Sequence, residues 1–381
     1  MLNSDMTSRP QGIFSRSVSL SVLSILAMFS QISVDAAQPT LYPGVEWSRT
    51  TPEAAGWDPQ ILTEAHDYSK QIGTTSFIAI QHGTIVASCG DIDHRFKIYS
   101  ARKSLLSALT GIAVNAHQLD LDDTLGTLGI DDVFPALTDS EKRATVRDLL
   151  ESKSGVYHVA LYETDRERRV RPIRGSHAPG TFWYYNNWDF NALGSIYEKA
   201  VGKSIFESFE SQIADPLEMQ DYRVSDGSYE RGSDSLHAAY LFKMSARDLA
   251  RFGLLYLNEG RWKEQQVVPA SWVAESTTPH SDAIMHAGYG YLWWTSRNGQ
   301  HLDTQDLPAG SFWADGSDGQ FVIVDPIDDL VVVHQTNTRA LFGLVGNGNR
   351  VSEQQMGHLM WLLLTAAHAK DPGRDPMLSG S

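Results

Sequence analysis

The chain has 381 residues, 42% of them hydrophobic and 20% charged, so it has enough apolar material for a large core and is neither disordered nor collagen-like. Its 31 basic and 46 acidic side chains give a formal net charge of −15, and such an acidic surface repels nucleic-acid phosphates and anionic lipid headgroups. The single cysteine, Cys89, excludes an internal disulfide and a multi-cysteine zinc or iron–sulfur site. Nucleic acid is therefore not expected as a partner, and any chemistry must come from oxygen and nitrogen side chains.

The first 36 residues differ from the rest of the chain and are predicted to form a secretory signal peptide. Arg9 and Arg16 give a weakly basic start, and residues 18–29 form a mostly apolar run that ends before a stretch of small residues. This run is shorter than the about 20 apolar residues that span a bilayer, and the cysteine lies far from the cleavage point, so no stable membrane anchor is expected. A buried first helix is the alternative interpretation. We therefore expect residues 37–381 to form a soluble domain that is periplasmic or secreted.

Two β-hairpins are predicted, one near each end of this domain. Residues 76–80 and 85–87 are β-branched runs that flank a Gly-containing turn, and residues 321–324 and 330–333 form a similar pair around an Asp- and Pro-containing turn. Between the hairpins, and after the second one, apolar residues recur with helical spacing. These helix-period segments are 104–116, 144–152, 187–201, 245–257 and 351–367.

The order of these elements predicts an α/β (α+β) fold. An antiparallel β-sheet built from the N- and C-terminal segments would be flanked by helices, and a mainly helical region would be inserted between its two halves. We expect the sheet subdomain to comprise about residues 45–116 and 285–370, and the helical subdomain to comprise about residues 117–284.

The strongest candidate for chemistry is Ser100-Ala101-Arg102-Lys103, at the start of a predicted helix. The chain has no H-E-x-x-H zinc motif, no phosphate-binding P-loop and no G-x-S-x-G nucleophile elbow. On a helix, residues three apart share one face, so Lys103 Nζ can reach Ser100 Oγ. The start of a helix also carries unpaired backbone N–H groups that favour developing negative charge. The alternative interpretation is an N-capping serine beside a solvated lysine.

A second signal follows at residues 178–187, where a turn leads into aromatic residues and two amides. Together with Ser100 and Lys103, this stretch resembles the serine β-lactamase superfamily, which also contains DD-peptidases, penicillin-binding proteins and esterases. The resemblance is to its class C-like branch, whose members carry S-x-x-K and then Y-x-N. Residues 312–322, just before the second hairpin, lie where this superfamily has its K-T-G or H-x-G strand.

The tyrosine of the second motif has two possible registers. Alignment on Pro179-Gly180 places the motif tyrosine at Tyr185 and its amide at Asn187. The tripeptide Tyr184-Tyr185-Asn186 also fits Y-x-N, so Tyr184 stays open as an alternative. The alignment favours Tyr185.

The resemblance implies a β-lactamase/transpeptidase-like fold and acyl transfer with Ser100 as the nucleophile. Lys103, when neutral, or Tyr185 would accept the serine proton, and the choice between them stays open. Asn187 would hydrogen-bond Lys103 or a substrate carbonyl, and backbone N–H groups of Ser100 and Ser317 would form the oxyanion hole. Water would then clear the acyl-enzyme, so neither a cofactor nor a metal ion is required.

The chain departs from the superfamily pattern at Ala314-Asp315-Gly316, which stands in place of K-T-G. An Asp315 carboxylate at the site would repel a substrate carboxylate, so efficient hydrolysis of β-lactams or D-alanyl-D-alanine is not expected. An uncharged ester or amide, or a ligand whose amino group faces Asp315, suits the pattern better. The following Gly316-x-x-Gly319-Gln320 is similar to the third motif of 6-aminohexanoate-dimer hydrolases. The alternative is that Asp315 points to solvent.

Two further groups of residues have both a structural and a functional interpretation. The tryptophans Trp183, Trp293, Trp294 and Trp313 could form the wall of an apolar acyl pocket or could pack in the core. A cluster of five arginines between residues 166 and 174 could be a solvated face, or could border the site and attract an anionic part of a substrate.

The leading hypothesis is a secreted serine hydrolase of the esterase or amidase type, with a small-molecule ester or amide as its substrate. A class C-like β-lactamase or DD-peptidase is the first alternative. A non-catalytic homologue that binds peptidoglycan or a peptide is the second. The sequence leaves the natural substrate and the oligomeric state open.

Overall fold

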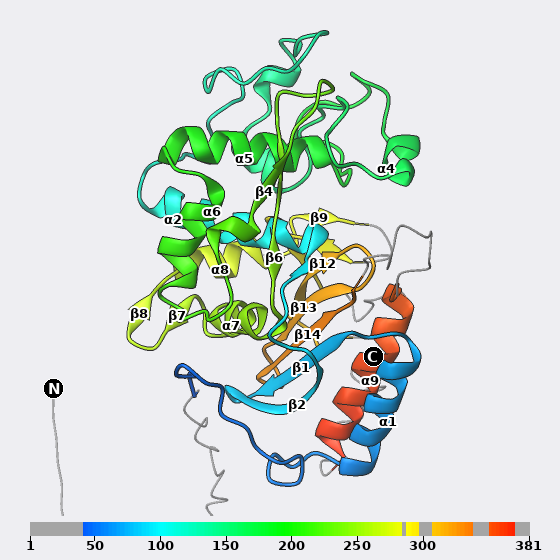
Figure 1. Ribbon diagram of the computed structural model, residues 1–381. Helices are drawn as coiled ribbons and strands as arrows, with labels where there is room; N and C mark the ends of the chain where they lie inside the picture. Colours follow the sequence, from blue (N-terminus) through cyan, green and yellow to red (C-terminus); the bar gives the residue numbers. More distant parts are fainter. Residues whose placement is uncertain (1–40, 284–286, 297–306, 338–349, 370–381) are drawn as a thin grey trace, which may run out of the picture. The chain divides into compact units, whose positions relative to one another are not determined.

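The computed structural model describes residues 41–283, 287–296, 307–337 and 350–369, all within the structural unit Pro39–Ser381 (Figure 1). The predicted signal peptide lies outside the described residues. The dominant element is an eight-stranded antiparallel sheet with the strand order β2-β1-β14-β13-β12-β11-β10-β9. Three two-stranded sheets, β3-β6, β4-β5 and β7-β8, complete the β-structure of the described residues.

The strands of the large sheet come from both ends of the unit. The first predicted hairpin is β1 (Ser76–Gln81) with β2 (Thr84–Gly90), and the second is β13 (Gln320–Asp325) with β14 (Leu330–Gln335). β1 pairs directly with β14, which joins the two hairpins. The other strands of this sheet are β9 (Ser281–Asp282), β10 (Gly288–Tyr289), β11 (Trp294–Thr295) and β12 (Phe312–Gly316). The predicted sheet and the α/β fold class are therefore confirmed.

The remaining elements lie around this sheet and between its halves. The short strands are β3 (Phe96–Lys97), β4 (Ser228–Glu230), β5 (Ala239–Leu241), β6 (Lys243–Met244), β7 (Arg261–Trp262) and β8 (Gln265–Gln266). The α-helices are α1 (Pro59–Gln71), α2 (Arg102–Asn115), α3 (Val146–Leu150), α4 (Asp165–Val170), α5 (Asn187–Val201), α6 (Ile205–Phe209), α7 (Ala246–Leu257), α8 (Ala270–Ser276) and α9 (Glu353–His368). In the described part of the chain, none of these helices has the length and apolarity that a membrane crossing needs.

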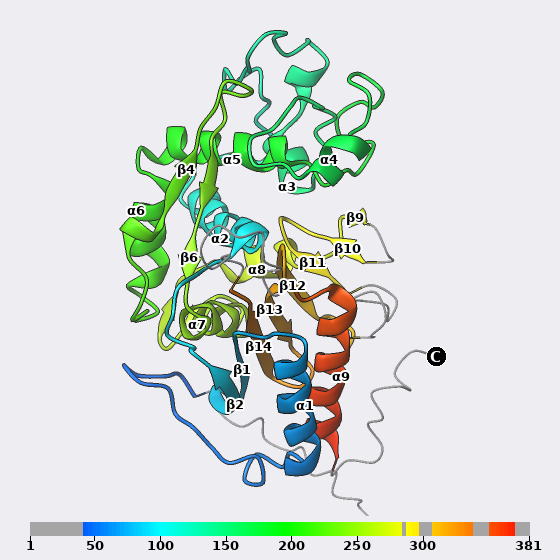
Figure 2. The same cartoon turned by 45° about the vertical axis from the view of Figure 1, so that its right-hand side comes forward.

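Helices cover both faces of the large sheet. On one face α1 and α9 lie side by side (Figure 2) and share a core cluster with Phe77 and Ala79 of β1. On the other face, Ile78 and Ile80 of the same strand belong to the core that contains α2 and α7. Successive side chains of a strand point to opposite faces, and every residue of β13 and β14 is buried because both faces are covered.

The segment between the two halves of the sheet is mainly helical, and side-chain caps start several of its helices. Asp148 N donates to Thr145 Oγ1 at α3, and Glu167 N donates to Thr164 Oγ1 at α4, with both carboxylates returning to the cap backbone. Part of the predicted helical subdomain, residues 117–284, belongs with the sheet. In this part, α7 packs on β13 and β14, and β9 is the edge strand.

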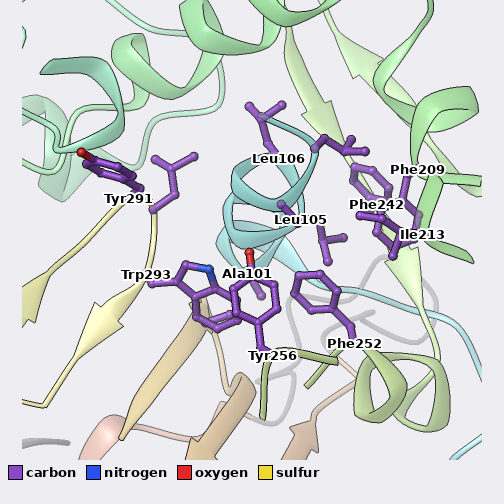
Figure 3. Packing of buried hydrophobic residues seen from close by; sticks show 14 of the residues in the cluster. Ala101, Leu105, Leu106, Phe209, Ile213, Phe242, Phe252, Tyr256, Tyr291 and Trp293 are labelled. Carbon is purple, nitrogen blue, oxygen red and sulfur yellow. The ribbon is translucent and has the colours of Figure 1, made fainter. Parts of the chain in front are cut away.

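The buried helix α2 carries the predicted site at its N-terminus. Figure 3 shows Leu105 of α2 beside Phe252 and Tyr256, and Leu106 on another side of the same helix; both leucines belong to the large core cluster that spans the helical region and the sheet. Burial of one such leucine contributes roughly 1.5–3 kcal/mol relative to exposure. Because α2 is packed from several sides, its first turn is a rigid support for side chains that need fixed positions.

Candidate active site

Ser100 lies in a tight turn that leads from β3 into α2. Residues Tyr99–Ala101 form a 3₁₀ turn, and α2 follows at once. Tyr99 has a φ of 45°, a conformation that non-glycine residues rarely adopt. The N-cap residue of α2 is Ala101, and no side chain caps this helix. The interpretation of Ser100 as an N-capping serine is therefore wrong.

The hydroxyl of Ser100, the amine of Lys103 and the phenol of Tyr185 meet at one point. Lys103 Nζ lies 2.8 Å from Ser100 Oγ and 2.8 Å from Tyr185 Oη, and the two hydroxyls also interact. Lys103 is only 2% exposed, and its Nζ lies 4.5 Å and 4.6 Å from the ring centroids of Tyr185 and Phe190. The solvated lysine of the alternative interpretation is thus also wrong, and the structure brings all three predicted side chains together.

Burial controls the protonation of this group. Desolvation, reinforced by the charge of Arg102, lowers the pKa of Lys103 well below its ordinary value. Burial raises the pKa of Tyr185 far above its ordinary value. The site therefore favours a neutral amine on Lys103 and a protonated phenol on Tyr185.

Arg102 supplies a permanent positive charge next to Lys103, and the motif analysis did not single it out. Its side chain is fully buried, and the guanidinium carbon lies 5.3 Å and 5.1 Å from the ring centroids of Tyr162 and Tyr240. Nη1 donates to the Tyr99 carbonyl over 3.1 Å. Among the described residues, Nε and Nη2 have no acceptor and no carboxylate pairs with the guanidinium.

The structure places Tyr185, and not Tyr184, next to Lys103. Tyr184 Oη donates to the Glu167 backbone carbonyl over 2.9 Å, and its own carbonyl accepts a hydrogen bond from Ser152 Oγ over 2.6 Å. Asn186 N donates to the same Ser152 hydroxyl. Hydrogen bonds thus hold the loop on both sides of Tyr185. The Tyr185 hydroxyl contacts Lys103 of α2, whereas the Tyr184 hydroxyl contacts α4.

Asn187 opens α5 and contacts a carboxylate that the motif analysis missed. Its Nδ2 donates to Glu167 Oε1 over 3.0 Å, and not to Lys103, which was one of its two expected partners; the other, a substrate carbonyl, stays a prediction. The other oxygen of Glu167 accepts from the backbone N–H and the hydroxyl of Thr164 at the start of α4. The Glu167 charge acts on both Lys103 and Tyr185. The capping-box spacing of Thr164 and Glu167 is visible in the sequence, but their closeness to the site is a product of the fold.

Strand β12 ends against the turn that carries Ser100. A Cβ at Gly316 would lie 2.2 Å from the carbonyl oxygen of Ile98 and 3.2 Å from the backbone nitrogen of Ala101. Only glycine allows the strand to pass so close to this turn. The contact brings the exposed Ser317, the predicted second oxyanion donor, to the same side of the molecule as Ser100.

The turn after β12 is held by buried residues at the end of β14. Thr336 Oγ1 donates to the Asp318 carbonyl over 2.6 Å, and His334 Nδ1 donates to the Gly319 carbonyl over 2.7 Å. Burial lowers the pKa of His334 to about 4, so the imidazole is neutral at physiological pH. These contacts fix the path of the chain around Ser317.

Asp315 is half-buried, and its carboxyl is close enough to Lys103 for the two charges to interact. Burial and, to a smaller extent, the charge of Glu353 raise the pKa of Asp315, Lys103 lowers it, and the net result is a pKa of about 7. The alternative in which Asp315 points to solvent does not fit this environment. At neutral pH the group is partly protonated, so its repulsion of anions is weaker than that of a full carboxylate.

An aromatic cluster borders Tyr185, but it contains only two of the four tryptophans that the sequence suggested. Trp294 stacks on Tyr185 with ring centroids 5.7 Å apart, and Trp183 lies 6.0 Å from Trp294. Tyr289, which the motif analysis did not single out for this role, lies 5.2 Å from Trp294. The other two, Trp293 and Trp313, are buried in two separate core clusters.

The arginine cluster is chiefly structural. Arg171 pairs with the buried carboxylate of Glu163, and Arg174 Nη2 lies 2.7 Å from Oε2 of the buried Glu141. Arg174 also donates to the carbonyls of Pro135 and Ala136. Arg171 and Arg174 therefore neutralise buried acids. Across the described ranges, no group of three or more His, Cys, Asp and Glu side chains is arranged to hold a metal ion.

A protein-family model described as Beta-lactamase matches residues 60–352, well over half of the chain and all of the site described above. The chain belongs to the Beta-lactamase family. The resemblance that the motifs suggested is thereby confirmed, and with it a β-lactamase/transpeptidase-like fold.

Solved structures of other members share this fold with the present β-lactamase-family protein. A candidate 6-aminohexanoate-dimer hydrolase from Bacillus anthracis has a TM-score of 0.60 at 17% identity, over 87% of this chain and 89% of the other. A β-lactamase from Mycobacterium bovis has a TM-score of 0.56 at 20% identity, over 81% of this chain and 98% of the other. In sequence, an uncharacterised protein of Alkalihalophilus pseudofirmus is 23% identical over 270 residues, which is 65% of this chain and 74% of that protein. The family is one of β-lactamase-fold hydrolases, and this protein is a member of it.

Proposed function

We propose that this β-lactamase-family protein is a serine hydrolase that cleaves ester or amide bonds through an acyl-enzyme on Ser100. The observation that carries the proposal is the position of Lys103 Nζ, 2.8 Å from both Ser100 Oγ and Tyr185 Oη in a buried site. A lysine with a lowered pKa, in contact with a serine hydroxyl, is the arrangement that activates a serine nucleophile.

The protonation states support Lys103 as the general base. A neutral Lys103 accepts the proton of Ser100 as Oγ attacks the substrate carbonyl carbon. Tyr185 keeps its proton because burial raises its pKa, so it donates to the leaving group and is reprotonated from Lys103. Backbone N–H groups of Ser100 and Ser317 would hold the oxyanion, a contribution of about 3–4 kcal/mol per donor. Water then hydrolyses the acyl-enzyme by the reverse sequence of proton transfers.

The surroundings of the site favour a small ester or amide that carries no negative charge on the side of Asp315. Trp183, Trp294 and Tyr289 offer aromatic surface beside Tyr185. Asp315 stands where a cation and a hydroxyl would otherwise hold a carboxylate, and it suits an amino group better than an anion. Likeness in fold to a candidate 6-aminohexanoate-dimer hydrolase supports an amide among the substrates to be tried.

We also propose that residues 1–36 direct export and are removed, so that the mature enzyme is periplasmic or secreted. The basic start, the apolar run and the small residues that follow it support this. Mass spectrometry of the protein purified from a periplasmic fraction should find an N-terminus near residue 37. An intact Met1 on protein confined to the cytoplasm would contradict the proposal.

The activity is tested with short-chain p-nitrophenyl esters and anilides, and with intact-mass analysis after reaction with a fluorophosphonate. Wild type should turn over the esters and gain one adduct, Ser100→Ala should do neither, and the exposed-site control Ser225→Ala should behave as wild type. Lys103→Met should lower the acylation rate by about 10²–10⁴-fold while the protein stays folded. Wild type without an adduct, or Ser100→Ala with one, would instead favour the non-catalytic peptidoglycan- or peptide-binding homologue.

A β-lactamase or DD-peptidase activity is the second candidate, because the family itself favours it. Nitrocefin separates the two, since it carries the carboxylate that Asp315 opposes. We expect nitrocefin to be a poorer substrate than the esters. Equal turnover of both would show that Asp315 does not control the choice of substrate.

A further inference from the structure

A cavity of about 790 Å³ lies beside the nucleophile turn and contains none of Ser100, Lys103 and Tyr185 in its lining. It is bounded by β3, β6 and the chain just after β14, and Tyr99 forms part of its wall. The charged residues in the lining are Asp93, Arg95, Lys97, Asp221, Arg223, Asp226 and Lys243, joined by the polar His94, Thr336 and Asn337. The proposed acyl-transfer chemistry uses none of them.

Two lysines lie next to each other on the wall of this cavity. β3 and β6 are antiparallel, and Lys97 is directly opposite Lys243 in their register. Directly opposed residues point to the same face, and two like charges in such a pair are destabilising. Within the described residues, neither ammonium has a carboxylate at ion-pair distance, so no ion pair among these residues offsets their repulsion.

The acidic residues of the cavity are already engaged by arginines. Arg247 lies 3.2 Å from Asp93 and 2.6 Å from Asp221, and Arg95 lies 3.2 Å from Asp226. These pairs leave the two lysines uncompensated.

Arg223 adds a further positive charge to the cavity wall. Its guanidinium donates to the backbone carbonyls of Gln220 and Tyr222, and among the described residues it has no carboxylate partner. The wall therefore carries local positive charge in a protein with a net charge of −15. Such a focus attracts anions against the field of the whole molecule.

The cavity adjoins the nucleophile from the side of Tyr99. Tyr99 immediately precedes Ser100 in the 3₁₀ turn. Thr336, also in the lining, holds the turn that carries Ser317 through its hydrogen bond to the Asp318 carbonyl. Asp315 is not part of the lining. Tyr99 and Thr336 thus connect the cavity wall to the two turns that carry Ser100 and Ser317, whereas Asp315 is not part of that wall.

We propose that this cavity is a subsite for a carboxylate carried by the substrate, held by Lys97 and Lys243. The preferred substrate is then an ester or amide with a carboxylate several bonds from the cleaved carbonyl, placed on the Tyr99 side and not on the Asp315 side. The position of the cleaved bond rests on the proposed function. The anion site itself rests only on the cavity and its charges.

The kinetic experiment compares matched charged and neutral substrates. One arm uses mono-4-nitrophenyl adipate against 4-nitrophenyl hexanoate, which places the carboxylate on the acyl group. The other uses 4-carboxyphenyl hexanoate against 4-carbamoylphenyl hexanoate, which places it on the leaving group. For each arm, we take the ratio of kcat/KM for the charged substrate to kcat/KM for the neutral substrate. In at least one arm, this ratio should be about tenfold lower in the double variant Lys97→Gln/Lys243→Gln than in wild type. In wild type, the same ratio should fall when NaCl is added. The control Lys203→Gln, at an exposed lysine, should match wild type.

A binding experiment separates this inference from the proposed chemistry. Adipate is titrated into Ser100→Ala by NMR, with adipamide as the neutral analogue. Adipate should bind, adipamide should not, and Lys97→Gln/Lys243→Gln added to Ser100→Ala should weaken adipate binding about tenfold. Lysine-dependent adipate binding in a protein that hydrolyses no ester would sink the serine-hydrolase proposal and leave the subsite standing. Ester turnover through Ser100 with no charge preference in either arm, or adipate binding that ignores the lysines, would overturn the subsite.

Discussion

Around Ser100, burial shifts the pKa values of three neighbouring side chains. Lys103 has a lowered pKa, Tyr185 a raised one, and Asp315 a pKa raised to about 7. Each shift has desolvation as its largest cause, because a buried site disfavours whichever form is charged. The charge of the neighbouring Arg102 adds to the effect of desolvation on Lys103.

Replacement of Arg102 by methionine tests this electrostatic role. The Arg102 charge lowers the pKa of Lys103, so its removal should raise that pKa and require a higher pH to make the amine neutral. We expect the acidic limb of the kcat/KM–pH profile to move to higher pH by about one unit, with an about tenfold loss of activity on that limb.

The control is Lys203→Met, which removes a positive charge at an exposed position. Its profile should stay close to that of wild type, and both variants need an unchanged circular dichroism spectrum. An acidic limb that stays in place in Arg102→Met would contradict an electrostatic effect of Arg102 on Lys103.

At the scale of elements, the site is the meeting of α2, β12 and the loop before α5. α2 brings Lys103, the loop brings Tyr185 and β12 brings Asp315 and Gly316. Their mutual positions depend on close packing, which rotates or shifts a whole element when one side chain no longer fits. At Gly316 the neighbouring atom is the backbone carbonyl oxygen of Ile98, which cannot move aside as a flexible side chain would.

We expect Gly316→Ala to move β12 away from the nucleophile turn. The new Cβ would lie 2.2 Å from the Ile98 carbonyl oxygen, so the strand must shift, at a cost of about 1–3 kcal/mol in stability. A shift of this kind should lower kcat by about 10²-fold. Chemical denaturation and ester kinetics measure the two effects. Gly44→Ala, where a Cβ meets nothing within 4 Å, is the control, and a Gly316→Ala enzyme with full activity would contradict this account of β12.

At the scale of the whole molecule, the large sheet is assembled from segments far apart in the chain. The turn between β13 and β14 contains a buried acid. Asp325 ends β13, is fully buried, and its Oδ1 accepts the backbone N–H groups of Ile327 and Asp328. Burial, together with the nearby Asp328 carboxylate, raises the pKa of Asp325 to about 7. A group with a raised folded-state pKa stabilises the fold at low pH, and this stabilisation is lost as the pH rises through about 7.

Asp325→Asn should therefore stabilise the protein at alkaline pH. At pH 8.5 the wild-type carboxyl is ionised in a buried site, whereas the amide is neutral and still accepts the same backbone N–H groups. We expect the free energy of unfolding of the variant to exceed that of wild type by roughly 1–3 kcal/mol at pH 8.5 and by much less at pH 5. Thermal unfolding at both pH values measures the difference. A gain that is equal at the two pH values would point to packing and not to titration.

Local sequence patterns predicted much of this protein. The alternation and helical spacing of apolar residues predicted the hairpins, the order of elements and the antiparallel sheet from both ends, because these periodicities follow from strand and helix geometry alone. The spacing of Ser100 and Lys103 indicated a shared helix face, and the Tyr185 and Asn187 motif indicated the family. Each of these inferences needs only residues that are close in the chain.

The tertiary structure decided what depends on neighbours from distant segments. It placed Tyr185 and not Tyr184 beside Lys103, turned Asn187 to Glu167, and sent Trp293 and Trp313 into the cores. It also made Lys103 a buried amine, paired the arginines with buried acids, and set Lys97 opposite Lys243. The physical reason is common to all of them: desolvation, charge pairing and the direction of a side chain arise when separate elements pack, and a one-dimensional pattern does not contain that packing.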